Sequence, residues 1–435
     1  MRPPGSSLDR VTAAAPAFRW RTAAVAIYGP SIVFAIGEGA VLPMIPHIAE
    51  DLGATLAFAG LIVAVVTIGE LLGTLPAGWL LPRIGERLAM ILASVLALVG
   101  STIAFFAPNP ILLAVGVLFI GVAGSIFQIA RQAFLTVYVP LSHRARALST
   151  LGGTLRFGLS VGPLIIAAII AAGGGPTASF ILQGVAAVGI IVLLLCLKDP
   201  QHTMAAMDAE QTERIEAVQR PEGMLATFRR NRRVLGTIGV GAAALSALRQ
   251  SRQMILPLWA VAIGLSPDST ALIIGIAGFI DFALFYTGGW VMDRFGRMWI
   301  VMPVTIGLSI GHILLAVTGL LPWPVVWFAI MAGVLSVANG LGSGVLMTLS
   351  ADLAEPENPA PFLAIWRLLQ GLGGAAAPLI ISGVTAIASL PIAAVTIGVL
   401  GLGGAWIFGT SLRRYDPRAA TGAPGADGPA EAKPA

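Results

Sequence analysis

The fold is decided by the stretch GWVMDRFGR, residues 289–297, which lies between two long apolar runs. A second copy, GWLLPRIGE at residues 78–86, lies between two other apolar runs, and each of its positions precedes its match by 211 residues. The same offset relates Gly53 to Gly264. A fixed offset over this much of the chain indicates an internal duplication, so we expect two copies of one structural unit.

The composition is that of a membrane protein with many spans. Hydrophobic residues make up 57% of the 435 residues, charged residues make up only 11%, and the mean hydropathy is +0.88. This balance is too apolar for a water-soluble globule. Serial apolar runs of helical length exclude a barrel of short alternating strands. The first run is too long for a signal peptide and contains Glu38, so we interpret it as a retained first helix.

Twelve apolar stretches have the length of transmembrane helices. Each has at least the ~20 residues that are needed to cross ~30 Å of hydrocarbon. They are expected at residues 22–46, 55–81, 87–107, 110–139, 147–172 and 177–197 in the first half, and at residues 234–263, 269–292, 298–320, 323–351, 361–387 and 390–412 in the second. In this reading the chain from His47 to Leu52 is a short outer loop.

The predicted fold class is an all-α polytopic membrane protein, with twelve transmembrane helices in two pseudo-symmetric six-helix bundles. The two tails are rich in small residues and proline, which predicts disorder. The connector between the bundles is rich in arginine and is expected to be partly an amphipathic helix that rests on anionic headgroups. The expected parts are an N-terminal tail at 1–21, a first bundle at 22–198, the connector at 199–233, a second bundle at 234–412 and a C-terminal tail at 413–435.

The positive charge of the chain lies on one side of the expected membrane. The net charge is +5, but every Lys and Arg outside the expected spans falls in segments on one face. This asymmetry is the positive-inside signature, so it indicates a multi-pass protein of the cell membrane with both termini in the cytoplasm, and it argues against nucleic acid as a partner. Cys196 is the single cysteine, which excludes an intramolecular disulfide.

The repeated stretch resembles the cytoplasmic loop motif of the major facilitator superfamily of transporters, Gly-x-x-x-Asp-Arg-x-Gly-Arg, which lies between helices 2 and 3 and again between helices 8 and 9. The second copy matches in full, whereas Pro82 replaces the acid in the first. The resemblance therefore implies that Asp293 alone can supply the conformation-sensitive ion pair of the motif. The gating residues that it implies are Gly78, Arg83, Gly85, Gly289, Asp293, Arg294, Gly296 and Arg297.

Helix 5 carries a second, partial resemblance. Gly158, Gly162 and Pro163 are similar to the antiporter motif of the drug–proton antiporters in this superfamily, but the two glycines that should follow are missing. Pro163 removes a backbone donor and bends the helix, so an ordinary kinked span is the alternative. The family's helix 4 motif would place an arginine at Val117, so proton routing through that arginine is not expected.

Three acids, Glu38, Glu70 and Asp281, lie well inside the expected spans. An ionisable group at membrane depth is expensive, so a functional role is expected for each. Burial disfavours the charged form of a carboxyl group, which suits it to exchange a proton as a coupled transporter requires. Glu38, in the middle of helix 1, is the main candidate for proton coupling. The alternative is that each carboxylate pairs with an arginine and holds helices together.

Five arginines also lie inside the expected spans. Arg131 and Arg367 are close to the cytoplasmic ends and are expected to extend to the interface. Arg156, Arg249 and Arg252 lie deeper and are candidates for the substrate cavity. The charges of these three arginines balance those of the three acids. This balance favours pairing between the acids and the arginines over a binding site for a multiply charged anion.

Two further pairs are related by the offset of 211 residues. Glu38 corresponds to Arg249, on helices 1 and 7, which face each other across the central cavity in the family that the chain resembles. Gln128 corresponds to Asn339, on helices 4 and 10. Buried amides need hydrogen-bond partners, which can be other helices or the substrate, and helix packing is the favoured reading. His312 has no acid at helical spacing and is expected to be structural.

These features predict a secondary active transporter that works by alternating access, with the proton gradient as its energy source, no cofactor and no enzyme activity. The favoured function is proton-coupled efflux of small amphipathic or drug-like compounds, as the resemblance implies. The alternative is an importer or facilitator of a polar metabolite whose carboxylate would bind Arg249 and Arg252. A receptor or scaffold without transport is disfavoured by the intramembrane acids. The expected partners are the lipid bilayer, protons and a small-molecule substrate, and the chain is expected to act as a monomer.

Overall fold

The structure is a computed structural model, and it describes residues 20–138, 141–196, 224–354 and 359–412. The first half contains α1 (Trp20–Val41), α2 (Ile45–Asp51), α3 (Leu56–Phe105), α4 (Pro110–Tyr138), α5 (Leu141–Ala171) and α6 (Ala178–Cys196). The second half contains α8 (Met224–Arg230), α9 (Arg232–Val234), the π-helical turn η2 (Leu235–Gly239), α10 (Val240–Ala262), α11 (Pro267–Phe295), α12 (Met298–Thr318), α13 (Pro324–Leu341), α14 (Val345–Leu353), α15 (Pro359–Ile387) and α16 (Leu390–Ser411).

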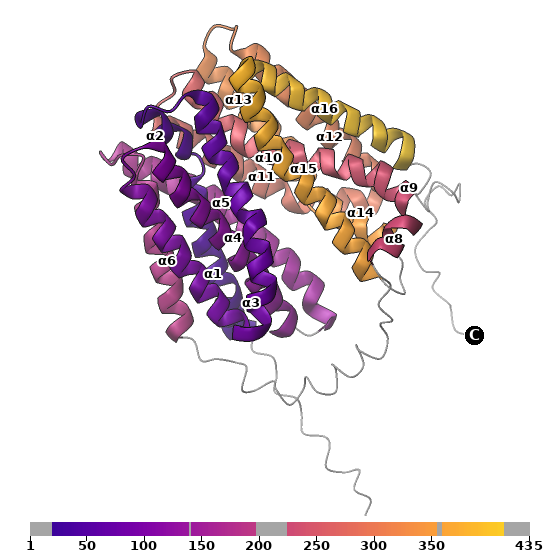
Figure 1. The fold of residues 1–435 in the computed structure, drawn as a ribbon. Coiled ribbons are helices and arrows are strands. Elements are labelled where there is room, and N and C mark those ends of the chain that lie inside the picture. Colours follow the sequence, from indigo (N-terminus) through magenta and orange to yellow (C-terminus); the bar gives the residue numbers. More distant parts are fainter. Residues whose placement is uncertain (1–19, 139–140, 197–223, 355–358, 413–435) are drawn as a thin grey trace, which may run out of the picture.

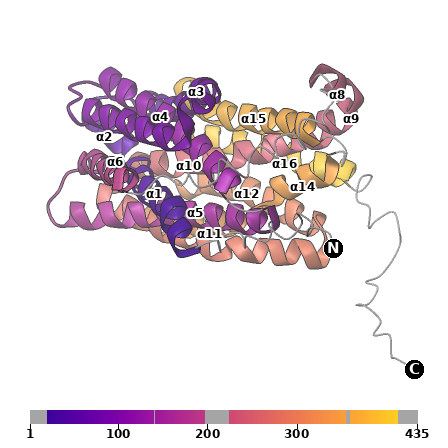
Figure 2. The same ribbon diagram turned by 90° about the horizontal axis from the view of Figure 1, so that it is seen from below.

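The helices form two groups that follow the two halves of the sequence. Figure 1 shows α1 to α6 together on one side and α10 to α16 together on the other. The groups meet along two seams, where α5 packs against α11 and α3 packs against α15, as the view in Figure 2 shows. The predicted bounds of the connector and the two tails lie for the most part outside the described residues, so the domain limits stay a prediction.

Ten stretches of the described chain are long and apolar enough to cross a membrane. The 50 residues of α3 form one of them. At 1.5 Å per residue they are far longer than one crossing requires, so α3 supplies two spans. Helix α10 is not among the ten, because Arg249, Gln250, Arg252 and Gln253 interrupt its apolar sequence. Two spans in α3 and a further one in α10 account for the twelve that the sequence predicts.

The repeated glycines of the loop motif turn the chain at equivalent places. Gly85 has φ 78° and ψ 166°, and this non-helical residue divides α3 into its two spans. Gly296 has φ 94° and ψ 167° and ends α11. A residue with a Cβ atom rarely adopts such angles, so glycine is needed at both positions. Gly53 and Gly264 also share a positive φ, of 82° and 68°. The duplication is therefore visible in the backbone as well as in the sequence.

The structure differs from the sequence-based expectation at two helices. The expected outer loop at residues 47–52 is wrong, because α2 continues to Asp51 with Pro46 in its first turn, where proline is well tolerated. The expected tenth span is broken: α13 ends at Leu341 and α14 begins at Val345. Gly344, with φ 78°, lies in this break. The break falls where two glycines flank a serine, and apolar periodicity alone does not reveal it.

Candidate functional site

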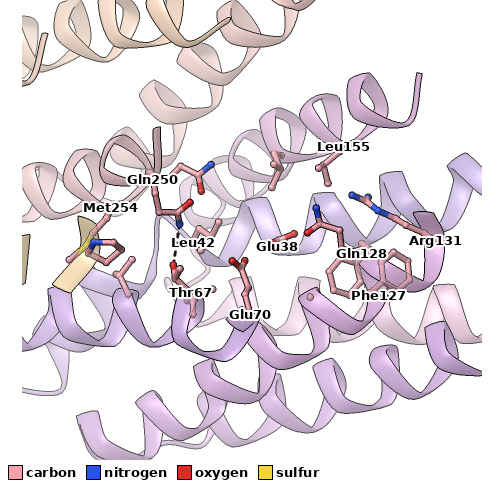
Figure 3. Close-up of a pocket in the computed structure, with 17 residues that line it drawn as sticks. Glu38, Leu42, Thr67, Glu70, Phe127, Gln128, Arg131, Leu155, Gln250 and Met254 are labelled. Atoms are coloured by element: carbon pink, nitrogen blue, oxygen red, sulfur yellow. Dashed lines mark hydrogen bonds between the residues drawn. The ribbon is translucent and has the colours of Figure 1, made fainter. Parts of the chain in front are cut away.

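A cavity of about 260 Å³ lies between the two halves, and we call it the central cavity. Most of its lining comes from α1, α3, α4 and α5, with three residues from α10 and one from α15. Figure 3 shows its polar side chains. The polar and charged residues of the lining are Glu38, Thr67, Glu70, Gln128, Arg131, Gln250 and Gln253.

Two of the three predicted acids share the central cavity. Glu38 extends from α1 and Glu70 from α3, and their charges lie close enough to act on each other. Neither carboxyl group has a hydrogen bond or an ion pair within the described part of the chain. Two like charges in one small cavity repel each other, and both have lost part of their hydration. Two acids from different helices thus share one small cavity.

Arg131 is the cation that lines the central cavity, and its predicted position at the membrane interface is wrong. It was expected to extend to the membrane interface, but it is only 5% exposed and lines the cavity from α4. Its charge acts on Glu38. Arg131 follows Gln128 by three residues, so both lie on one face of α4. That spacing was the signal in the sequence that could have assigned Arg131 to the cavity.

Amide side chains complete the polar lining. Gln128, predicted from the sequence, is exposed to the cavity, as is Gln253 of α10. The amide of Gln250 donates a hydrogen bond of 3.1 Å to the hydroxyl of Thr67, which joins α10 in the second half to α3 in the first. The sequence reading missed Gln250 and Gln253, although they follow Arg249 and Arg252 directly.

The third acid, Asp281, is the centre of a second group of residues, which we call the Asp281 cluster. Its carboxylate accepts a hydrogen bond of 2.5 Å from Nη1 of Arg156, one of 3.1 Å from Nη2 of Arg252 and one of 2.8 Å from Nδ2 of Asn339. Asp281 is 7% exposed and Asn339 is 6% exposed. Arg156 belongs to the first half and the other three residues to the second, so the cluster joins the halves at the α5–α11 seam. The structure thus brings together four predicted site residues from four helices.

Small residues place the Asp281 cluster. A Cβ atom on Gly340 would lie 2.7 Å from the backbone oxygen of Asp281, so only glycine lets α13 come this close to α11. The preceding residue, Asn339, then reaches the carboxylate. A Cβ atom on Gly278 would lie 2.9 Å from Oγ of Ser160, which shows an equally close approach of α11 to α5. Close backbone packing through small residues is typical of helices in membranes.

Arg249 lies beside this cluster and not in the central cavity. Its Nη2 donates a hydrogen bond to the backbone oxygen of Gly342, at the break between α13 and α14. The charges of Arg156, Arg252 and Asp281 all act on it. The expected placement of Arg249 opposite Glu38 is therefore wrong, because the break offers Arg249 a carbonyl group that a continuous helix would have used internally.

The two halves differ in the charged groups at positions that the repeat relates. The offset of 211 residues relates Glu38 to Arg249 and also relates Arg131 to Gly342. In the first half, the charge of an arginine on α4 acts on an acid on α1. In the second half, an arginine on α10 donates to the carbonyl oxygen at the equivalent position, just after the end of α13. Equivalent positions of the two halves therefore carry different groups, with the arginine on α4 in the first half and on α10 in the second.

The two groups of residues carry opposite net charges. Glu38, Glu70 and Arg131 give the central cavity a formal charge of −1. One carboxylate among Arg156, Arg249 and Arg252 leaves a formal charge of +2 around Asp281. The balanced pairing expected from the sequence is wrong, because Arg131 is a fourth buried arginine and because the acids are divided unequally. Within the described residues, no group of His, Cys, Asp and Glu could hold a metal ion.

The remaining predicted residues are distributed over the periphery. In the loop motifs, the guanidinium of Arg83 stacks at 3.6 Å over Trp79 and that of Arg294 lies 5.8 Å from the ring centre of Trp290. Arg297 forms an ion pair of 2.7 Å with Asp352. The side chain of Asp293 lies outside the described part of the structure, so its proposed gating contact stays a prediction.

The glycines of the helix 5 motif pack α5 against α1. A Cβ atom on Gly158 would lie 2.8 Å from the backbone oxygen of Ile32, and one on Gly39 would lie 2.7 Å from that of Leu159. This close approach fits a packing role for Gly158 and Gly162 beside the part of α1 that carries Glu38. His312 is buried, with its ring nitrogens 2.8 Å from Oγ of Ser251 and 2.7 Å from the oxygen of Leu308, as a structural histidine requires.

The fold and the paired halves place the chain among the membrane transporters. The sequence profile of the Major Facilitator Superfamily matches residues 31–333 and, in a second match, residues 238–435. The chain therefore belongs to the major facilitator superfamily. It is a multi-pass membrane protein and a secondary transporter of small molecules, it is not an enzyme, and transporters of this family use no cofactor.

Solved structures with low sequence identity share the fold. A POT family transporter in complex with a thioalcohol conjugated peptide has a TM-score of 0.72 at 11% identity, over 90% of this chain and 96% of that one. The partially occluded inward open xylose transporter XylE from E. coli has a TM-score of 0.66 at 16% identity, over 89% of this chain and 99% of that one. They support the fold class that the sequence predicts.

Curated relatives differ in how much of the chain they match. The probable nitrate/nitrite transporter NarK2 of Mycobacterium tuberculosis is 27% identical over 356 residues, which cover 78% of this chain and 82% of the relative. Inositol transporter 4 of Arabidopsis thaliana is 28% identical over 147 residues, and the match spans only 25% of its length. The probable anion transporter 6 of Oryza sativa subsp. japonica is 29% identical, over 36% of its length. The expected likeness to drug–proton antiporters is not supported by these relatives.

Proposed function

We propose that the protein is a proton-coupled transporter of a small anionic solute. The observation that carries this proposal is the Asp281 cluster with its neighbour Arg249, where two guanidinium groups pair with one carboxylate and a third lies beside them. An uncompensated charge in such an environment costs several kcal/mol. A bound anion would offset that cost, so the site favours a negatively charged ligand over a neutral one.

Several of the relatives support the same class of solute, whereas others are named as transporters of the neutral solute inositol. A probable nitrate/nitrite transporter matches along most of the chain, and a probable sulfoacetate transporter of Cupriavidus necator matches 39% of it at 24% identity. Nitrate, carboxylates and sulfonates are small oxyanions that guanidinium groups bind through paired hydrogen bonds. The alternative that the sequence left open, transport of a polar metabolite with a carboxylate, therefore becomes the favoured one.

Proton coupling is assigned to Glu38 and Glu70. Entry of one anion against a negative membrane potential costs about 2.3 kcal/mol per 100 mV. Protons that travel with the anion cancel this cost. The two carboxyl groups of the central cavity can carry them, since ionising both beside each other is unfavourable and Arg131 offers only one positive charge. Glu38 is the main coupling group, because it shares the central cavity with Arg131, whose charge acts on it.

Efflux of a cationic amphipathic compound is the second candidate. The central cavity has a net negative charge, and Phe34, Phe127 and Leu155 give it apolar walls. Such a cavity suits a lipophilic cation. This function does not account for the excess of arginine around Asp281, which is why we rank it second.

Flux measurements in proteoliposomes separate the two candidates. Purified protein would be tested with nitrate, acetate and sulfoacetate, with the neutral solute inositol, and with a lipophilic cation, in each case after an imposed pH jump. Anion uptake that acidifies the interior, and that fails in Arg252→Gln but not in the exposed control Arg232→Gln, would support the proposal. Uphill movement of the cation without anion flux would support the second candidate instead.

We also propose that the protein lies in the cell membrane as a monomer with both termini in the cytoplasm. The exposed arginines of α8 and α9 lie on the connector side of the second bundle, where a cytoplasmic connector would meet the membrane surface. Protease accessibility of tags at both termini in oriented vesicles tests this orientation. Protection of both tags in right-side-out vesicles is the expected result, and digestion of either tag there would contradict it.

A further inference from the structure

The carboxylate of Asp281 is bound as an anionic ligand would be. Its two oxygens take hydrogen bonds from three donors: Oδ1 from Arg156, and Oδ2 from both Arg252 and Asn339. Arg252 also donates to the hydroxyl of Ser336 at 2.8 Å, which holds its guanidinium in place. The donors come from α5, α10 and α13, and the carboxylate comes from α11.

The donors exceed what one carboxylate can satisfy. Nε of Arg249 and Nε of Arg252 are buried and have no hydrogen-bond partner among the described residues, nor has Oδ1 of Asn339. Two positive charges remain without a counter-ion in this group. A site with spare buried donors and spare positive charge is incomplete with Asp281 alone.

We propose that Asp281 occupies the anion site of the empty transporter, and that the transported anion takes its place between Arg156 and Arg252. This inference rests on the proposed anion transport and specifies its substrate. The solute must present two oxygen acceptors on one small, singly charged group, as a carboxylate, nitrate or a sulfonate does. A neutral polyol has no charge to replace the carboxylate and is rejected.

Displacement of Asp281 links binding to movement of the halves. Asp281 holds Arg156 across the α5–α11 seam, and this is an ion pair between the two halves. When an anion binds Arg156 and Arg252, α11 loses its contact with α5 through that pair. The anion therefore changes the relative stability of the two arrangements of the halves, which a ligand can do only through a difference in its contacts. The protein's own carboxylate thus sets how strongly an anion must bind to be transported.

Anion affinity in the Asp281→Asn variant tests the proposal. Asparagine keeps the shape of the side chain and removes the competing charge. Binding of nitrate to the purified full-length protein, measured by titration calorimetry, should tighten roughly ten- to a hundredfold, within the range of known coupling effects. The matched control is Asp268→Asn at the start of the same helix, outside the cluster, which should leave nitrate affinity unchanged. An Asp281→Asn protein that elutes as wild type and binds nitrate no more tightly would overturn the proposal.

A second measurement covers the case in which Asp281→Asn does not fold. Spin labels on α5 and α11 of the wild-type protein should report a changed distance across the seam when nitrate is added, and no change with inositol. Distances that are the same with saturating nitrate would also overturn the proposal. A different result would show that the proposed function itself is wrong. In that case proteoliposomes with the wild-type protein would transport no anion, whatever the nitrate affinity of Asp281→Asn.

Discussion

Replacing Gly340 with alanine should disturb the geometry of the Asp281 cluster. The change lies on α13, which contributes no charged residue to the cluster, so the charges themselves stay the same. The added Cβ atom would lie 2.7 Å from the backbone oxygen of Asp281 and 3.0 Å from its Cα atom. Non-bonded heavy atoms prefer about 3.5–4.0 Å, and backbone atoms cannot turn aside, so α13 must move away from α11 by up to about 1 Å. The hydrogen bond of 2.8 Å from Asn339 to Asp281 would then be stretched or broken.

The expected loss combines two effects. Overpacking of a close helix contact costs about 1–3 kcal/mol, and loss of a hydrogen bond to a charged group costs about 1.5–3 kcal/mol. Gly333 lies on the same helix, and a Cβ atom added there would have nothing within 4 Å, so Gly333→Ala is the matched control. It should be neutral or stabilising by up to about 1 kcal/mol, because alanine favours helix over glycine.

Thermal unfolding of the purified protein, followed by tryptophan fluorescence, measures both variants. Gly340→Ala should melt clearly below wild type, and Gly333→Ala should melt at or above it. Nitrate affinity should change only in Gly340→Ala. If both variants melt together with wild type, the close approach of α13 to α11 does not hold in solution and the reasoning about the cluster is refuted.

Three further predictions concern coupling and gating. Glu38→Gln should retain exchange of the solute but lose the roughly tenfold accumulation that one pH unit supplies per coupled proton; vesicles that still accumulate solute would move the coupling role to Glu70. Arg131→Gln removes the cation beside Glu38 and should impair uphill transport, whereas Arg131→Lys should preserve much of it, and equal transport by both variants in a liposome assay would speak against an electrostatic role. Asp293→Asn should shift the balance between the two open states with solute affinity nearly unchanged, and spin-label distances identical to wild type would count against its gating contact.

Helix number, duplication and family were readable from the sequence, because each depends on local composition or on spacing along the chain. Apolar runs of about 20 residues must be helices in a bilayer, since no other single segment satisfies its backbone groups there. The repeated glycines have similar backbone angles at residues 85 and 296, so the offset in sequence corresponds to an equivalence in the fold. The cost of ionisable groups at membrane depth also marked Glu38, Glu70 and Asp281 as candidates.

Partners of these charges were decided by tertiary structure alone. The repeat suggested that Glu38 faces Arg249, but Arg249 donates to the carbonyl oxygen of Gly342, and it is the charge of Arg131 that acts on Glu38. A helix break depends on two glycines that are unexceptional in a chain with 52 of them. Hydrophobic pattern does not distinguish these from the glycines that merely pack.

The sequence also did not predict that the charged residues divide between the central cavity and the Asp281 cluster. Asp281 meets Arg156 from a helix 125 residues earlier, and Asn339 from one 58 residues later. Such contacts depend on how closely helix backbones approach each other. Small residues such as Gly340 permit a close approach, but their presence in the sequence does not identify the helix that packs there. The sequence by itself therefore determined that this is a two-fold repeated membrane transporter with charged groups inside it. Only the packing of its helices decided which charges meet, because spacing along a helix specifies a face and not the helix that lies against it.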